Sequence, residues 1–155
     1  MSYEIRPARQ EDLEQLVTLC KRHANFEGVA YSEEGKIDAL NKALFIASSS
    51  LKAMVAAQGQ KLIGYTTFVR QFSTWDAAFY LYMDCLYLDD AYRNMGIGQK
   101  LLEKVKKEAI ALGCKEVQWQ TPIDNEKAIS FYKREGASIK EKARCFLNIE
   151  NDYLS

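Results

Sequence analysis

Apolar residues in this chain recur with two different spacings, which predict helices in some stretches and strands in others. A helical spacing over residues 11–24 predicts a helix. Two apolar runs, 51–57 and 61–70, are separated by Gln-Gly-Gln and predict a β-hairpin. Further elements are expected as a strand at 3–6, a helix at 36–45, a strand at 80–88, a helix at 97–112, a strand at 116–120, a helix at 125–134 and two strands within 138–149.

The stretch 80–112 organises the rest of the chain. Residues 79–88 are almost all apolar or aromatic, as in a strand that is buried on both faces, and Asp84 is the one carboxylate among them. Gly96 and Gly98 then stand at the mouth of the following helix. Glycine permits close approach of a ligand to the backbone, and a helix N-terminus attracts anions. The pattern therefore predicts an anion site beside an acid.

Length and composition indicate one globular domain, residues 1–155. Apolar residues make up 48% of the sequence and charged residues 27%. A chain of this length buries roughly two-thirds of its unfolded surface. Hairpins and crossovers are mixed along the chain, so the expected fold is α/β, a mixed sheet with helices on both faces.

The charge balance excludes several classes of function. Lys plus Arg and Asp plus Glu each total 21, so the net charge is zero. This balance argues against a general nucleic-acid-binding or anionic-membrane-binding protein. The sequence has no signal-peptide pattern and no apolar run long enough for a bilayer, so a cytoplasmic location is expected. Four scattered cysteines and a single histidine predict reduced packing thiols and no metal site.

The segment from Arg93 to Gly98 carries the strongest chemical signal. Its glycines and the helix that follows suit a pyrophosphate cradle, to which Arg93 could add charge. The alternative is a tight strand–helix connection that merely needs glycine. The segment is neither a Walker motif nor a dinucleotide fingerprint, because it lacks Gly-Lys-Ser/Thr and a third glycine.

Three other side chains have both a functional and a packing interpretation. Burial would raise the pKa of Asp84 and suit it as a general base; the alternative is that Asp84 points into a solvated groove or pairs with a lysine. Tyr132 can donate a proton to a leaving group, although a tyrosine at helical spacing is usually a core residue. Trp75 either walls a substrate pocket or anchors its own loop.

Together the motifs resemble the GNAT superfamily of acetyl-CoA-dependent N-acetyltransferases. The shared features are a strand, an R-x-x-G-x-G turn opening a helix, another strand, and an N-x-x-A-I-x-F-Y-x-x-x-G-A helix, which together span residues 80–137. Ser-Thr-Trp before the central strand and Tyr-Arg-x-x-Gly-Ile-Gly are similar to the spermidine/spermine (diamine) acetyltransferase branch. The resemblance implies a GNAT-type, mostly antiparallel sheet with a splayed strand pair.

The resemblance also implies roles for individual residues. The coenzyme would be bound by the backbone of Leu86, Tyr87 and Leu88, by the turn Arg93, Asn94, Met95, Gly96, Ile97, Gly98 and Gln99, and by Asn125. Tyr132 would protonate the departing thiolate, and Asp84 stands where diamine acetyltransferases have a glutamate that accepts the amine proton through water. Cys85 replaces an acid of that branch, which weakens the case for a polyamine.

The expected activity is transfer of the acetyl group from acetyl-CoA to a primary amine of a small molecule. An alkyl amine, with a pKa near ~10.4, must first lose a proton. The N–H of Leu86 or Tyr87 would stabilise the charge on the thioester oxygen. Trp75, Glu27 and Asp84, with Asp76, would form an acceptor mouth that attracts cations. An antibiotic or protein N-acetyltransferase and a non-catalytic acyl-CoA sensor are the alternatives, and the late strands are a possible homodimer interface.

Overall fold

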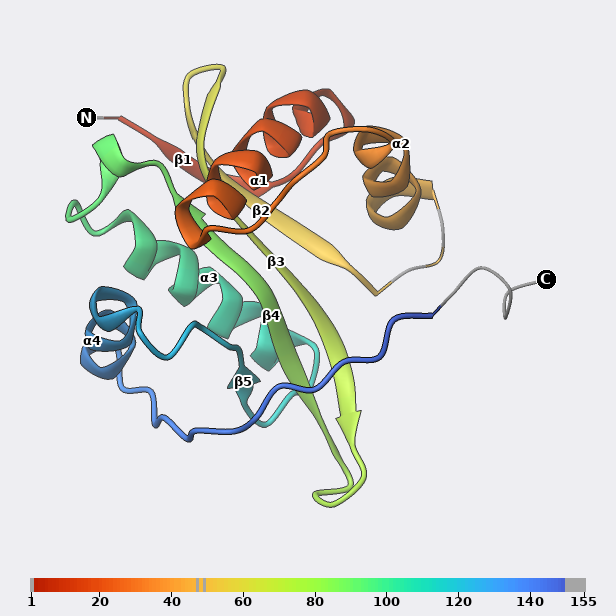
Figure 1. The fold of residues 1–155 in the computed structure, drawn as a ribbon, viewed down its shortest axis with the longest axis vertical. Helices are drawn as coiled ribbons and strands as arrows, with labels where there is room; N and C mark the ends of the chain where they lie inside the picture. The colour runs from red at the N-terminus through yellow and green to blue at the C-terminus, as the bar shows by residue number, and fades with distance from the viewer. Residues whose placement is uncertain (1, 47, 49, 150–155) are drawn as a thin grey trace. The chain divides into compact units, whose positions relative to one another are not determined.

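One five-stranded sheet, in the order β1-β2-β3-β4-β5, forms the framework of the first of two compact units, Met1–Gln120 (Figure 1). This computed structural model describes residues 2–46, 48 and 50–149. The strands are β1 (Glu4–Pro7), β2 (Lys52–Gln58), β3 (Lys61–Ser73), β4 (Ala78–Leu88) and β5 (Val117–Gln118). The first four are antiparallel to their neighbours, and β5 runs parallel to β4. The predicted mixed, mostly antiparallel sheet is confirmed.

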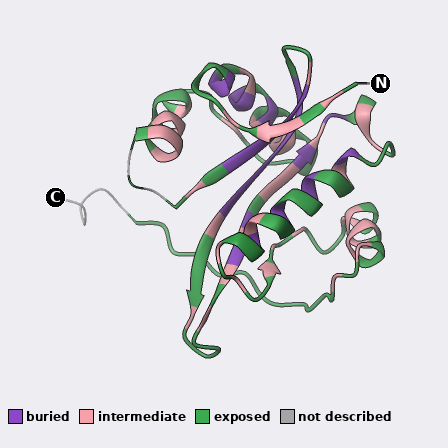
Figure 2. Ribbon diagram, turned by 180° about the vertical axis from the view of Figure 1, so that it is seen from behind, coloured by how far each residue is buried: buried purple, intermediate pink, exposed green. Residues whose placement is uncertain are grey.

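Helices lie on both faces of this sheet, as the sequence predicted. They are η1 (Gln10–Asp12), α1 (Leu13–Glu27), α2 (Lys36–Asn41), the π-helical turn η2 (Lys42–Ile46), η3 (Asp90–Tyr92) and α3 (Ile97–Ala111). Figure 2 shows α3 lying along the strands with its buried residues turned toward them. The predicted helix at 36–45 is thus a short α-helix that continues as a π-helical turn.

Two layers of apolar side chains join the helices to the sheet. On one face, Leu16 and Leu19 of α1 pack with Val55 and Tyr65. On the other face, Leu102, Val105 and Ala109 of α3 pack with strand residues that include Met54, Phe68 and Met83. The alternation of β2 places Met54 and Val55 on opposite faces, as the period of two requires.

An ion pair fixes the entry to α1. The Arg6 guanidinium donates to both carboxylate oxygens of Asp12, at 2.7 and 3.0 Å, and the Arg9 N–H donates to the same carboxylate at 2.8 Å. Asp12 is buried. Its charge is acceptable there because these donors surround it.

Gly64 lies where two strands approach closely. It pairs with Leu88, and a β-carbon at this position would lie 2.8 Å from the Tyr87 carbonyl oxygen. No other residue has a side chain small enough for this contact, so the glycine permits β3 and β4 to pair at the end of β4.

The second unit, Thr121–Ser155, contains α4 (Glu126–Arg134). The two strands predicted within 138–149 are absent, so that prediction was wrong for these described residues. A strand needs a hydrogen-bonded neighbour, and none pairs with this segment, whose Phe146 and Leu147 are largely exposed. The homodimer interface expected of those strands therefore loses its basis. In the described part of the chain, no helix is long and apolar enough to cross a membrane.

Candidate active site

The turn that joins β4 to α3 has the backbone of an anion site. Asn94 and Gly96 have positive φ angles of 62° and 81°, and Gly96 is the N-cap of α3. A β-carbon added at Gly96 would meet no heavy atom within 4 Å, so this backbone faces open space. The first N–H groups of an α-helix have no intrahelical acceptor, and the helix dipole adds attraction for an anion. This geometry fits a diphosphate at residues 93–99.

The side chain of Arg93 is occupied within the protein. Its Nε donates to the Leu88 carbonyl at 2.9 Å, its guanidinium pairs with Asp90, and it lies 4.3 Å from the ring centroid of Phe26. These contacts tie the turn to the end of β4. Arg93 therefore supports the anion site by holding the turn, with its charge already balanced by a carboxylate.

β4 continues beyond its neighbour β5. The two strands pair only at Leu81 and Tyr82, whereas β4 extends to Leu88. β5 ends at Gln118, so the pairing of these two strands stops there. In the described part of the first unit, no strand pairs with this edge of β4 after residue 82. An extended ligand can hydrogen-bond to such an edge in the place of a strand.

Strand alternation identifies the backbone groups that face this open edge. The Cys85 carbonyl accepts a hydrogen bond from the Thr66 hydroxyl of β3 at 2.8 Å, so Cys85 directs its backbone toward β3. Successive residues of a strand direct their N–H and C=O groups to opposite sides. Leu86 therefore directs its N–H to the open edge, and Tyr87 does not. Of the two donors that the sequence left open, the geometry favours Leu86.

Asp84 is an extra residue in β4. Thr67 of β3 pairs with Cys85 and the next residue, Phe68, pairs with Met83, so Asp84 has no partner opposite it. Such a β-bulge redirects side chains locally. The Asp84 side chain is exposed, and the Cys85 thiol donates to its carboxylate at 3.6 Å. Of the two interpretations of Asp84, burial and a solvated position, the structure supports the solvated one.

A histidine that the sequence interpretation set aside lies near this bulge. His23 Nδ1 is 2.8 Å from the Tyr65 hydroxyl, and its Nε2 is 3.3 Å from a carboxylate oxygen of Glu27. The imidazole also stacks on Tyr87, with ring centroids 5.1 Å apart. The i,i+4 spacing of His23 and Glu27 was visible in the sequence. Their tyrosine partners come from β3 and β4 and could be found only in the fold.

The charges of two predicted acceptor-binding residues, Glu27 and Asp84, both act on the pKa of this histidine. Burial lowers the pKa of His23 below its usual value of 6.5, while the charges of Glu27 and Asp84 act in the opposite direction. Both carboxylates are therefore near enough to influence the same imidazole. The structure thus brings Glu27 and Asp84 to one region of the first unit.

The structure places Trp75 and Asp76 elsewhere. Trp75 is 99% exposed in the turn between β3 and β4, and Asp76 forms an ion pair with Lys115 at 3.0 Å. The extended strand between Ala78 and Asp84 spans about 20 Å at its rise of ~3.3 Å per residue. Within this chain, Trp75 and Asp76 do not join Glu27 and Asp84 in one acceptor mouth.

Asn125 and Tyr132 belong to the second unit. The Asn125 side chain caps α4 by accepting a hydrogen bond from the Ala128 N–H at 3.3 Å. Tyr132 is half-buried in α4, and its ring centroid lies 5.4 Å from that of Phe131. Their predicted roles at the coenzyme remain predictions.

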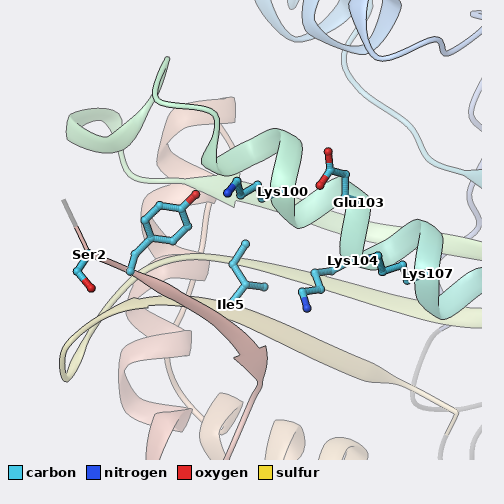
Figure 3. Close-up of a pocket in the computed structure, with 7 residues that line it drawn as sticks. Ser2, Ile5, Lys100, Glu103, Lys104 and Lys107 are labelled. Atoms are coloured by element: carbon cyan, nitrogen blue, oxygen red, sulfur yellow. The ribbon is translucent and has the colours of Figure 1, made fainter.

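A separate groove of about 420 Å³ lies along α3 and contains none of the predicted site residues (Figure 3). Its lining residues come from the N-terminal segment and from one side of α3: Ser2, Tyr3, Ile5, Lys100, Glu103, Lys104 and Lys107. The groove is an open, lysine-rich surface. No residue of the open edge of β4 lines it.

Comparisons with known proteins identify the family of the site. A family model described as "Acetyltransferase (GNAT) family" matches residues 11–137. A mouse thialysine N-epsilon-acetyltransferase is 28% identical over 144 residues, which cover 88% of this chain and 84% of the relative. A human spermidine/spermine N(1)-acetyltransferase-like protein 1 is 23% identical over 142 residues, which cover 87% of this chain and 20% of the relative.

The fold is also similar to that of a solved structure. An integron cassette protein from V. cholerae superposes with a TM-score of 0.76 at 26% identity. The match covers 99% of this chain and 96% of the cassette protein.

Proposed function

This chain belongs to the GNAT family of acetyltransferases, and we propose that it transfers the acetyl group of acetyl-CoA to the terminal primary amine of a small aliphatic molecule, amino-acid-like or polyamine-like. The observation that carries the proposal is the open edge of β4 at Leu86, which leads directly into the anion turn at Gly96. One ligand with a diphosphate and an extended amide arm matches both features. Acetyl-CoA has both.

The names of the relatives support the acceptor class. One is a thialysine acetyltransferase, and the other is named for its likeness to a polyamine acetyltransferase. Thialysine and polyamines share a primary amine at the end of a short flexible chain. Glu27 and Asp84 would attract such a cation by charge.

The amine must lose a proton before it attacks. An alkyl amine has a pKa near ~10.4 and arrives charged at neutral pH. Asp84 is the proposed first acceptor of that proton, through water. Its exposed position in the bulge leaves room for the water that the shorter aspartate side chain requires.

The neutral amine then attacks the thioester carbonyl directly. The N–H of Leu86 would donate to the oxygen on which negative charge develops, because it faces the open edge of β4. Tyr132 would give a proton to the departing thiolate, and Asn125 would contact the coenzyme near its thiol. Both of these residues come from the second unit.

Thiol release tests the proposal. Acetyl-CoA is incubated with the protein and a panel containing thialysine, lysine, spermidine, an aminoglycoside and a short peptide. We expect release with thialysine, lysine or spermidine above release with the other two. Tight coenzyme binding without release for any amine would contradict the proposal and favour a sensor.

A further inference from the structure

A group of polar side chains lies between α1 and the sheet at the end that contains the bulge. His23 is at its centre and has 17% of its side chain exposed. Nδ1 contacts the Tyr65 hydroxyl at 2.8 Å, and Nε2 contacts Glu27 at 3.3 Å. Tyr65 itself is 1% exposed. A buried tyrosine hydroxyl and a largely buried imidazole in direct contact can exchange a proton.

The same hydroxyl connects the imidazole to the bulge. The Cys20 and Cys85 side chains pack against the cluster that contains Tyr65, and they are close enough to influence the pKa of its phenol. The Cys85 thiol in turn donates to Asp84 at 3.6 Å. Neighbouring polar side chains therefore extend from the exposed carboxylate of Asp84, under α1, to Glu27, which is 33% exposed.

We propose that the proton released by the acceptor amine leaves the site through His23. The route, called the proton line below, consists of five neighbouring side chains: Asp84, Cys85, Tyr65, His23 and Glu27. The inference rests on the proposed acetyl transfer and adds the path by which its proton reaches solvent.

The proton balance of the reaction requires such a path. A charged amine and acetyl-CoA give an amide, a free thiol and one proton. One N–H bond of the ammonium breaks, its proton goes to Asp84, and the freed electron pair forms the C–N bond. A second N–H bond breaks as the amide forms, and its proton replaces the one that Tyr132 gives to the departing thiolate. From there it passes to Nδ1 of His23, while a second proton leaves Nε2 for Glu27 and solvent. A thiol and a phenol can each accept one proton while giving up another, so neither has to ionise.

The electrostatic surroundings suit His23 for this role. Burial lowers its pKa, which keeps the imidazole neutral and able to accept a proton at pH 7. Burial raises the pKa of the Tyr65 phenol far above its usual 10 and that of the Cys85 thiol to about 12, so both remain protonated. The charged or titratable groups that face His23 are Glu27, Asp84, Arg93, Tyr65 and Tyr87.

The first test is a pH profile of kcat for His23→Asn, with acetyl-CoA saturating. Asparagine keeps a hydrogen-bonding atom near the position of Nδ1 but does not titrate. At pH 7 we expect kcat to fall about 10-fold or more, the lower range of proton-transfer effects. Near pH 9.5 the loss should shrink below about twofold, because more of the amine arrives neutral. Tyr65→Phe should behave in the same way.

Tyr80→Phe is the matched control. It also removes one tyrosine hydroxyl with a side-chain partner, Gln71 at 2.6 Å, but this contact is exposed and lies outside the proton line. Its kcat should equal that of the wild type at every pH. A loss for His23→Asn that is equal at pH 7 and pH 9.5 would show a structural role and overturn the inference.

The second test does not depend on turnover. Because the chain has one histidine, its imidazole C–H signals can be titrated by NMR without assignment. Asp84→Asn and Glu27→Gln should each lower the pKa of His23, since each removes a negative charge, and Tyr80→Phe should not change it. If the pKa of His23 is unchanged in Asp84→Asn, the inference is overturned, whereas the proposed function is not affected. Absence of turnover with every amine in the wild type would overturn the proposed function and this inference with it.

Discussion

Met83 and Cys85 are two residues apart on one strand, yet they face opposite sides of the sheet. Met83 packs in the cluster that contains Leu102 of α3, and Cys85 packs in the cluster that contains Leu19 of α1. Regular alternation would place both on one face. The bulge at Asp84 reverses the alternation, and it leaves Asp84 exposed at the reversal.

Asp84→Asn should lower kcat/KM for an alkyl amine by about 10²-fold at pH 7, because the first proton acceptor is lost. Asp84→Glu should retain most of the activity, since its carboxylate reaches further without the bridging water. Steady-state kinetics at several pH values would check both variants. Equal activity of Asp84→Asn and the wild type would remove this carboxylate from the mechanism.

Gly96→Val should weaken acetyl-CoA binding about 10-fold or more, measured by calorimetry. The side chain would occupy the open space of the anion turn, at a φ of 81° that suits glycine. Gly59→Val is the matched control, because Gly59 has a similar φ of 61° and open surroundings in the β2–β3 turn. If both variants lose the same affinity, backbone strain is the cause and the turn does not hold the diphosphate.

Tyr132→Phe should lower kcat by roughly 10²-fold and leave the acetyl-CoA dissociation constant unchanged. The phenol is proposed to protonate the thiolate, a step that belongs to the transition state alone. Stopped-flow thiol release and calorimetry would measure the two quantities. An unaltered kcat would mean that the thiolate leaves without a proton from this residue.

Gly64→Ala should destabilise the protein by about 1–3 kcal/mol, the cost of overpacking. Its β-carbon would lie 2.8 Å from the Tyr87 carbonyl oxygen and 2.9 Å from Cδ1 of Leu88. Urea unfolding would measure the loss. A variant as stable as the wild type would show that β3 and β4 can separate here at little cost.

Asp12→Asn should lower the free energy of unfolding by about 3 kcal/mol at pH 7, because it leaves Arg6 without its buried partner. Burial raises the pKa of Asp12, but hydrogen bonds from Arg6 and the Arg9 N–H outweigh it and hold this pKa below its usual 3.8. The carboxylate therefore stabilises the fold fully above pH 3.8, and this contribution disappears as the pH falls through the lowered pKa.

Urea unfolding at pH 7, 5 and 3 would measure the difference in the free energy of unfolding between the wild type and Asp12→Asn. It should be the same at pH 7 and 5 and smaller at pH 3. Glu33→Gln is the control, because its pair with Lys21 is exposed at 3.8 Å and contributes less than ~1 kcal/mol. A difference that does not change down to pH 3 would contradict the assignment to Asp12.

The sequence determined the parts of this protein that depend on local periodicity and on motifs. The hairpin of β2 and β3, the long strand β4, α1, α3 and α4 were all predicted near their observed bounds. The glycines of the anion turn were identified because the conformation of a turn is set by the residues in it. The family followed from the order of these elements, and the match over residues 11–137 confirms it.

Only the tertiary structure decided which side chains meet. The contact between His23 and Tyr65 joins residues 42 positions apart, and no local pattern encodes it. The bulge at Asp84 depends on how β3 and β4 align, because register is a property of two strands. For the same reason, the two strands expected within 138–149 did not form, since among the described residues no strand pairs with that segment. Local conformation follows from the local sequence, whereas strand pairing and side-chain contacts depend on which distant segment the fold places alongside.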